Sequence, residues 1–233
     1  MYQNHQRFPK IDTNDKEAMY EMILDFKDKA NSALEPIQLH IKDCLEEAKQ
    51  NPDNDLYTQY YVMAPMYENE SIAKLQKVYG EPELEWLKLV VSHLIENTED
   101  RVGTQNELTN LCREGGNNSA NKKLSVTEAD KALKTFIDDG YLVKIKGSRK
   151  GFKIGIGVRF ILEMDGWLEK NFEDEISKCG VCDRVVLIFT QCSNRKCGTR
   201  FHLPCVDKAG KKDPKCNRCR ESLKLEGVAS KRS

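Results

Sequence analysis

The stretch CGTRFHLPC, from Cys197 to Cys205, places one histidine between two cysteines. It lies inside a cysteine-rich segment, because seven of the nine cysteines of the chain fall within residues 179–219. Together with the histidine they give eight candidate metal ligands, which are Cys179, Cys182, Cys192, Cys197, His202, Cys205, Cys216 and Cys219. Three pairs of them are separated by two residues, a spacing that lets both side chains reach one ion from a tight turn.

Eight such ligands are enough for two tetrahedral zinc ions. Thiolate and imidazole ligands suit zinc, and the histidine argues against an iron–sulfur cluster. With all four positions of each ion filled by protein, no position is open for water, so we expect both zinc ions to be structural. So short a segment buries little apolar area, and the metal would supply its folding energy. Free buried cysteines are a poor alternative for eight residues in this pattern.

Composition places the chain inside the cell. No apolar run approaches the ~18 residues that a membrane span needs, and the N-terminus MYQNHQRFPK lacks the apolar core of a signal peptide. We therefore expect an intracellular protein without a membrane partner. The formal net charge is zero, but residues 179–233 hold 13 Lys and Arg against 5 Asp and Glu. This basic end could meet an acidic partner or nucleic acid, or could be a solvated surface.

Upstream of the cysteines, residues 81–173 predict three helices and a hairpin. An apolar stripe runs from Trp86 to Ile95, and the capping boxes TQNE (104–107) and SVTE (125–128) each begin a further helix. Gly140 follows the third helix, where a left-handed residue is favoured. YLVKIK and FKIGI flank GSRKG as a β-hairpin, and a last helix carries apolar residues from Phe160 to Phe172. This order is that of a winged helix.

The third of these helices would be the recognition helix if the unit bound DNA. Its sequence, EADKALKTFIDD (128–139), has two lysines against four acidic residues. Phosphate contact needs positive charge, which is more abundant in the hairpin. We therefore expect protein–protein docking, with weak or indirect DNA contact left open.

The first block, at about residues 13–79, looks like the second half of a domain instead of a complete one. Apolar residues recur at helical spacing from Met19 to Ala30, and IQLHI (37–41) and LYTQYYVM (56–63) alternate like strands. The turn residues NPDND (51–55) lie between the two strands. The organisation we predict is a first block at 1–80, a winged helix at 81–173, a zinc domain at 174–222 and a disordered basic tail at 223–233.

The order of four cysteines, one histidine and three cysteines is used by plant homeodomain fingers and by variant RING domains. Plant homeodomain fingers carry a Trp before the seventh ligand, where this chain reads KDPKC. The motifs CGVC, KCGTRFHLPCV and PKCNRC, preceded by RFILEMDGWLEKNF, resemble the non-SMC element one family of the SMC five–six complex. ADKALKTFIDDGYLVKI also resembles the second winged helix of that family. The resemblance runs from about residue 15 to 220.

That resemblance implies an α+β protein with tandem winged helices followed by a two-zinc variant RING. The opening helices of the first winged helix are missing, which implies an abridged domain or a truncated chain. The resemblance also implies a nuclear ubiquitin-ligase subunit in DNA repair and recombination, docked to and activated by a MAGE-type partner. In the RING pattern the two zinc ions are cross-braced. One set would be Cys179, Cys182, His202 and Cys205, and the other Cys192, Cys197, Cys216 and Cys219.

RING ligases have no catalytic residue and act by holding a charged ubiquitin-conjugating enzyme in a reactive arrangement. By the family pattern that enzyme would contact Val181 and the segment between Cys216 and Cys219. Many active RING domains have Pro in that segment, where this chain has Asn217. Arg220 follows the last ligand, where active RING domains often carry a cation that contacts ubiquitin. The alternative is a docking or histone-reading module without enzyme activity.

Overall fold

The computed structural model describes residues 16–47, 58–66, 78–114, 123–146, 151–208, 215–221 and 223. Four predictions lie wholly or mostly outside these residues: the turn at 51–55, the loop at 115–123, the hairpin tip at 147–151 and the basic tail. Among the described residues, no helix combines the length and the apolar character that crossing a membrane requires.

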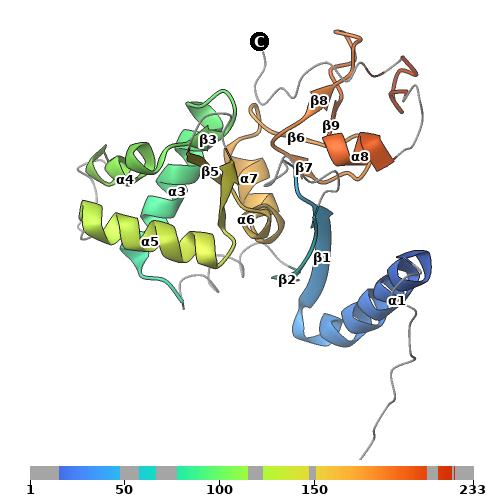
Figure 1. Cartoon of the computed structure of the whole chain (residues 1–233). Helices are drawn as coiled ribbons and strands as arrows, with labels where there is room; N and C mark the ends of the chain where they lie inside the picture. The colour runs from blue at the N-terminus through green and yellow to red at the C-terminus, as the bar shows by residue number, and fades with distance from the viewer. Residues whose placement is uncertain are drawn as a thin grey trace, which may run out of the picture.

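The middle of the chain forms three helices and a hairpin in the predicted order (Figure 1). The elements are α3 (Glu81–Glu96), β3 (Val102–Gly103), α4 (Gln105–Glu114), α5 (Val126–Asp138), β4 (Leu142–Lys146) and β5 (Phe152–Ile156). The short strand β3 was not predicted, and it joins the hairpin in an antiparallel sheet of order β3-β5-β4. The element order is compatible with a winged helix, and that assignment stays a prediction.

Local signals explain where these helices begin and end. The Ser125 hydroxyl accepts from the Glu128 amide, and the Glu128 carboxylate accepts from the Ser125 amide, which completes the second predicted capping box. Thr104 and Glu107 form the first box in the same way. Gly140 has φ +80°, the left-handed conformation expected after α5.

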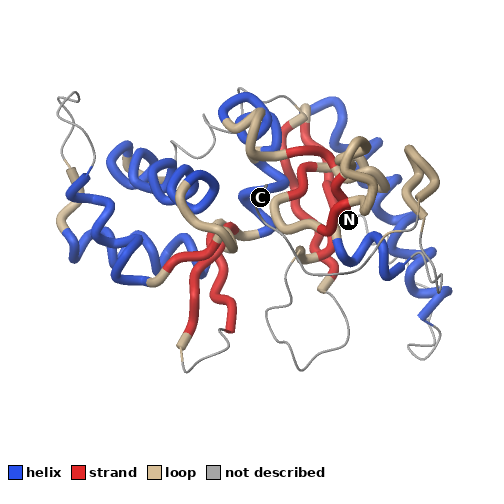
Figure 2. The backbone as a smooth tube through the Cα atoms, turned by 90° about the horizontal axis from the view of Figure 1, so that it is seen from above, coloured by secondary structure: helices blue, strands red, loops and turns tan. Residues whose placement is uncertain are grey.

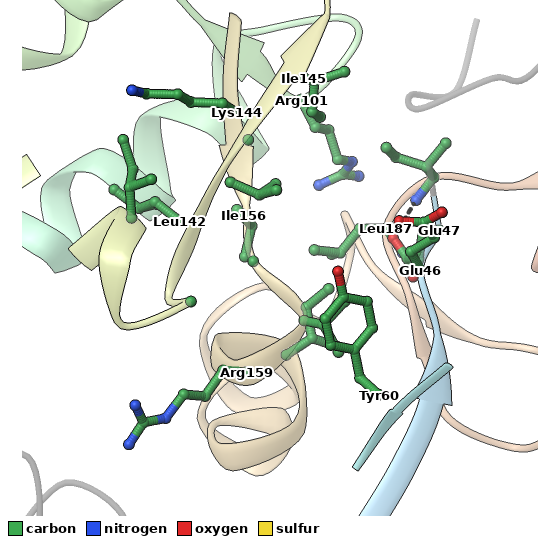
Figure 3. Close-up of a pocket in the computed structure, with 18 of the residues that line it drawn as sticks. Glu46, Glu47, Tyr60, Arg101, Leu142, Lys144, Ile145, Ile156, Arg159 and Leu187 are labelled. Carbon is green, nitrogen blue, oxygen red and sulfur yellow. Dashed lines mark hydrogen bonds between the residues drawn. The ribbon is translucent and has the colours of Figure 1, made fainter. Parts of the chain in front are cut away.

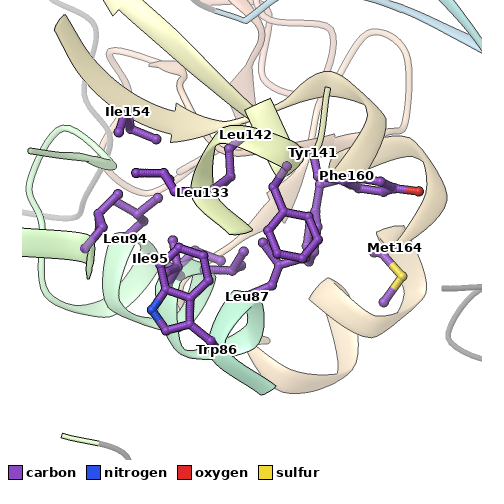
Figure 4. Packing of buried hydrophobic residues seen from close by; sticks show 14 of the residues in the cluster. Trp86, Leu87, Leu94, Ile95, Leu133, Tyr141, Leu142, Ile154, Phe160 and Met164 are labelled. Atoms are coloured by element: carbon purple, nitrogen blue, oxygen red, sulfur yellow. The ribbon is translucent and has the colours of Figure 1, made fainter. Parts of the chain in front are cut away.

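The main hydrophobic core lies between these helices and the sheet (Figure 4). Val90, Leu94 and Ile95 of α3 are fully buried, as is Phe136 of α5. Trp86 stacks on Phe136 with ring centroids 6.4 Å apart. Burial of each such side chain contributes about 1.5–3 kcal/mol, and none of the eight candidate ligands belongs to this core, so we expect it to fold without metal.

The last predicted helix is wrong in one respect, because it is interrupted at Met164. The structure has α6 (Val158–Glu163) and α7 (Asp165–Asn171) instead of one helix. Met164 has φ −118° and ψ 20°, which is outside the helical region, and α7 begins after it without a side-chain cap. The apolar residues Phe160, Leu168 and Phe172 are nevertheless buried.

The N-terminal block is a helix followed by a hairpin, as the sequence predicted. It contains α1 (Lys16–Leu34), a short 3-10 helix η1 (Glu35–Ile37), β1 (Leu39–Leu45) and β2 (Gln59–Pro65). The strands pair antiparallel, with Leu39 opposite Pro65 and Leu45 opposite Gln59. The Asn31 side chain exchanges two hydrogen bonds with the backbone of Ile41 and so fixes α1 on β1.

The cysteine-rich segment contains short elements around a second, smaller core. They are β6 (Ser177–Lys178), β7 (Val185–Val186), β8 (Thr190–Gln191), β9 (Arg200–Phe201) and α8 (Leu203–Lys208). Three of the eight buried members of this core are cysteines from the predicted ligand set. In Figure 2 the strands gather in two groups, one beside the middle helices and one where the N-terminal hairpin and the cysteine-rich segment lie together.

The β1–β2 hairpin connects these two sides of the molecule. Figure 1 shows β1 running from α1 toward the cysteine-rich segment. Lys42 pairs with Asp165 of α7 at 2.6 Å, and Asp43 pairs with Arg184 of the cysteine-rich segment at 3.3 Å. The N-terminal block therefore contacts both of the other units.

We expect Gly157→Ala to destabilise the middle unit. A Cβ atom at Gly157 would lie 2.2 Å from the Gly140 carbonyl oxygen, and this backbone cannot move without breaking the 2.8 Å bond from the Gly157 amide to Tyr141. Overpacking of this kind costs about 1–3 kcal/mol, measurable by urea unfolding. Gly80→Ala is the control, since Gly80 precedes α3 in a similar extended conformation with 3.6 Å of space. Equal effects at both positions would contradict this account.

Candidate metal centre

The eight predicted ligands form two clusters. The first contains Cys179, Cys182, His202 and Cys205, and the second contains Cys192, Cys197, Cys216 and Cys219. Within each cluster the candidate ligand atoms all lie within 4.8 Å of one another. Along the chain the first cluster takes the first and third ligand pairs and the second cluster takes the second and fourth, so the two alternate. This is the cross-braced grouping that the resemblance implied.

The spacing of the donor atoms fits zinc. In a tetrahedron with Zn–S bonds of ~2.3 Å, neighbouring sulfurs are about 3.8 Å apart. The Sγ atoms of Cys197 and Cys216 are 3.7 Å apart, and those of Cys192 and Cys219 are 3.4 Å apart. In the first cluster, His202 Nδ1 lies 3.3 Å from the Sγ of Cys182 and 3.7 Å from that of Cys205. The two clusters are therefore compatible with two zinc ions, each held by four protein ligands.

Two of the turns that present cysteines have the same backbone shape. In the first, the Asp183 amide donates to the Cys179 carbonyl, and in the second the Arg220 amide donates to the Cys216 carbonyl. Asp183 has φ 58° and Arg220 has φ 67°, so the residue after the second cysteine is left-handed in both turns. Each turn brings its two cysteines to one cluster.

Hydrogen bonds also prepare the clusters for a cation. Neighbouring thiols lower the pKa of Cys179, and hydrogen bonds with Thr199 lower the pKa of Cys197 to about 6, so each cluster has a thiol that readily becomes a thiolate. Burial acts to lower the pKa of His202, but hydrogen bonds to the cluster thiols and to Glu47 outweigh it and raise this pKa to about 12. Zinc binds thiolate and neutral imidazole, so zinc would have to displace the proton that these contacts favour on His202.

The three predicted contact residues lie close to the clusters, and all are exposed. Val181 sits inside the first cysteine turn with 58% of its surface exposed, and Asn217 sits inside the second. The Asn217 side-chain amide donates to the Gly180 carbonyl, which joins the two turns. Arg220 combines an exposed cation with a left-handed backbone. The structure brings Val181 and Asn217 to one face, and their contact role stays a prediction.

Sequence reasoning missed Glu47, whose carboxylate contacts the first cluster from the end of the hairpin. Its Oε1 atom lies 3.0 Å from His202 Nε2, and the pair is 155 residues apart in sequence. No local motif signals such a contact, because a single glutamate after a strand is ordinary surface composition.

A cavity of about 460 Å³ lies where the hairpin, the middle unit and the cysteine-rich segment meet. In Figure 3, Glu46 and Glu47 stand close to Leu187, and Arg101 is drawn nearby. Arg101 is 2% exposed, its guanidinium donates to the Glu175 carbonyl, and burial lowers its pKa to about 10. The eight candidate ligands, all of them described, do not line this cavity. It is a junction between units that borders the metal centre through Glu47 but contains none of its candidate ligands.

The fold and the site together define a class of protein. Its members have a mixed helix-and-sheet region followed by a RING-like domain with two Cys/His clusters. The model of a "RING-like domain" matches residues 179–219, which begin and end at the outermost ligands. The model of the "Nse1 non-SMC component of SMC5-6 complex" matches residues 3–164, more than half of the chain. The chain therefore belongs to the Nse1 family.

Individual relatives agree with this assignment. The "Non-structural maintenance of chromosomes element 1 homolog" of Pongo abelii is 26% identical over 210 residues, which cover 89% of this chain and 71% of the relative. The Xenopus laevis homolog is 28% identical over 206 residues, covering 88% and 69%. A solved chain of an "Nse1-Nse3-Nse4 complex" superimposes with a TM-score of 0.63 at 26% identity, covering 90% of this chain and 82% of that one.

Proposed function

We propose that this chain is a RING-type ubiquitin-ligase subunit of the SMC5-6 complex, acting in DNA repair and recombination in the nucleus. The observation that carries the proposal is the RING-like domain itself, with two cross-braced clusters and an exposed apolar residue, Val181, beside the first. Membership of a family defined as a component of a chromosome-maintenance complex supports the biological setting.

The mechanism that fits this site is catalysis by positioning. Four protein ligands complete each cluster, so the two zinc ions would shape the surface without touching substrate. Val181 would contact the conjugating enzyme and Asn217 would border that contact, while Arg220 would hold ubiquitin in a reactive conformation. Such restriction of motion is a recognised source of rate enhancement, and it needs no acid, base or nucleophile from the ligase.

A partner would complete the active form. The solved chain similar to this one is part of a complex with Nse3 and Nse4, and Nse3 is a MAGE protein. We therefore propose a MAGE-type partner that docks on this chain and activates it. The test is ubiquitin-chain formation by zinc-loaded protein across a panel of conjugating enzymes, alone and with that partner. Chains that form only, or much faster, with the partner would support the proposal, and no chains in any pairing would oppose it.

One observation favours the second candidate, a docking module without ligase activity. Asn217 stands where many active RING domains have Pro, and its side chain is bonded to Gly180. The same assay of ubiquitin-chain formation distinguishes the two functions. A docking module would bind the partner and both zinc ions but would form no ubiquitin chains.

The role of Arg220 can be tested without disturbing the fold. Arg220→Gly removes the cation and suits the left-handed backbone at this position. We expect chain formation to fall several-fold with two zinc ions retained. Asp183→Gly is the matched control, since Asp183 holds the equivalent position in the first cysteine turn without a positive charge. An unchanged rate for Arg220→Gly would exclude a ubiquitin contact by this side chain.

DNA contact, if it occurs, is proposed to be weak or indirect. The acidic surface of α5 opposes phosphate binding, as its sequence indicated. Of the basic residues on the described part of the hairpin, Lys153 pairs with Asp100 at 2.7 Å. The basic hairpin-tip residues Arg149 and Lys150 lie outside the described residues.

A further inference from the structure

The Glu47 carboxylate is buried against the cysteine-rich segment, although it belongs to the N-terminal block. Its side chain is 8% exposed. The carboxylate accepts hydrogen bonds from three donors. The backbone amide of Leu187 donates to it at 2.9 Å, and the amide of Ile188 also donates at 2.9 Å. The third donor is Nε2 of His202, at 3.0 Å.

These contacts determine which ring nitrogen of His202 would be available to bind zinc. Nε2 lies 3.0 Å from the Val185 carbonyl oxygen as well as 3.0 Å from Glu47 Oε1. A carbonyl oxygen can only accept, so the proton must sit on Nε2. Nδ1 then carries the lone pair, and it is Nδ1 that lies among the sulfurs of Cys182 and Cys205. With zinc bound at this cluster, Glu47 and His202 would form a carboxylate–histidine–zinc arrangement.

We infer that Glu47 is a positioning residue for the zinc ligand His202, so that the N-terminal hairpin helps to retain the metal of the first cluster. A carboxylate on the far nitrogen fixes the ring orientation and makes the metal-bound nitrogen more basic. The amides of Leu187 and Ile188 hold the carboxylate in place, and the ion pair between Asp43 and Arg184 fixes the strand that precedes it. The second cluster consists of four cysteines and has no imidazole to orient.

Coupling of this kind acts in both directions. If Glu47 strengthens zinc binding, zinc binding must strengthen the docking of the hairpin by the same free energy. The first zinc ion would therefore hold the N-terminal block on the cysteine-rich segment, while the second would not. This inference concerns metal retention and hairpin docking, and it does not depend on ligase activity.

The test is zinc release from the full chain to an excess of a chromogenic chelator. We expect Glu47→Gln to release one of its two zinc ions 10–100 times faster than the unmodified chain, the usual effect of losing such a partner. The other zinc ion should leave at the unmodified rate. Glu46→Gln is the control, because Glu46 is the neighbouring buried glutamate and accepts from the Thr58 amide within the hairpin instead of from the cysteine-rich segment. Unchanged release from Glu47→Gln would overturn the inference.

A second comparison separates an effect through His202 from an effect through the backbone amides. His202→Cys keeps four ligands but has no second nitrogen for Glu47 to contact. In that background Glu47→Gln should change zinc release less than about threefold, since the pair no longer interacts. An undiminished effect there would mean that Glu47 acts through Leu187 and Ile188 alone, and would overturn the positioning role. If Glu47→Gln does not retain two zinc ions on purification, Glu47→Asp takes its place with the same expected result.

Discussion

Chelation of zinc is expected to unfold the cysteine-rich segment, residues 177–223, and to leave the middle helices folded. The core of that segment has eight buried residues, and three of them are ligands. A structural zinc ion contributes about 10–16 kcal/mol in small zinc domains, which is as large as the whole stability of a typical domain. The core around α3 and α5 is larger and contains none of the eight ligands.

Hydrogen exchange before and after chelation would measure this difference. Amides such as that of Cys192, which donates to the Thr199 carbonyl at 2.9 Å, should lose their protection. Amides within α3 and α5 should keep theirs. The control is readdition of zinc, which should restore protection in the cysteine-rich segment. Protection that survives complete loss of zinc would show that the segment folds without metal, and the structural role assigned to the clusters would be wrong.

Val181→Arg is expected to reduce ubiquitin-chain formation more than tenfold while both zinc ions stay bound. Val181 is 58% exposed, so the substitution costs little folding energy. On the proposed contact surface, a charged side chain in place of an apolar one would cost 2 kcal/mol or more of binding, and ~1.4 kcal/mol corresponds to a factor of ten. The measurement is the rate of chain formation with the partner present.

The same substitution at another exposed valine provides the control. Val78 is 70% exposed and precedes α3, far from the clusters in sequence. Val78→Arg should leave chain formation within twofold of the unmodified rate. If Val181→Arg retained full activity with two zinc ions bound, the conjugating enzyme would have to bind elsewhere.

Local structure was predictable where it depends on interactions between a few neighbouring residues. The capping boxes beginning at Thr104 and Ser125, and the left-handed Gly140, are each set by residues within a few positions of one another. The eight ligands were predictable for the same reason, because residue type and spacing suffice to mark them. The division of the ligands into two clusters was not predictable from spacing, because spacing alone does not say which pairs share an ion. That division was predicted from the family resemblance.

What the sequence could not reveal depends on tertiary contacts. No proline marks the interruption at Met164, and Asp165 at the start of α7 is also bonded to Lys42 of the distant hairpin. The contact between Glu47 and His202 joins two units that no local pattern connects. The short strand β3 has only two residues, too few for any periodicity, and it exists because it pairs with β5.

The central claim is that this chain holds a charged conjugating enzyme in a reactive arrangement. Single-turnover discharge of ubiquitin from that enzyme to free lysine tests it most directly, with the zinc-loaded chain in its partner complex. The account predicts that the complex accelerates discharge at least tenfold and that Val181→Arg removes the acceleration. No acceleration by an intact complex that carries two zinc ions, with any conjugating enzyme tried, would contradict it and leave the docking module as the function.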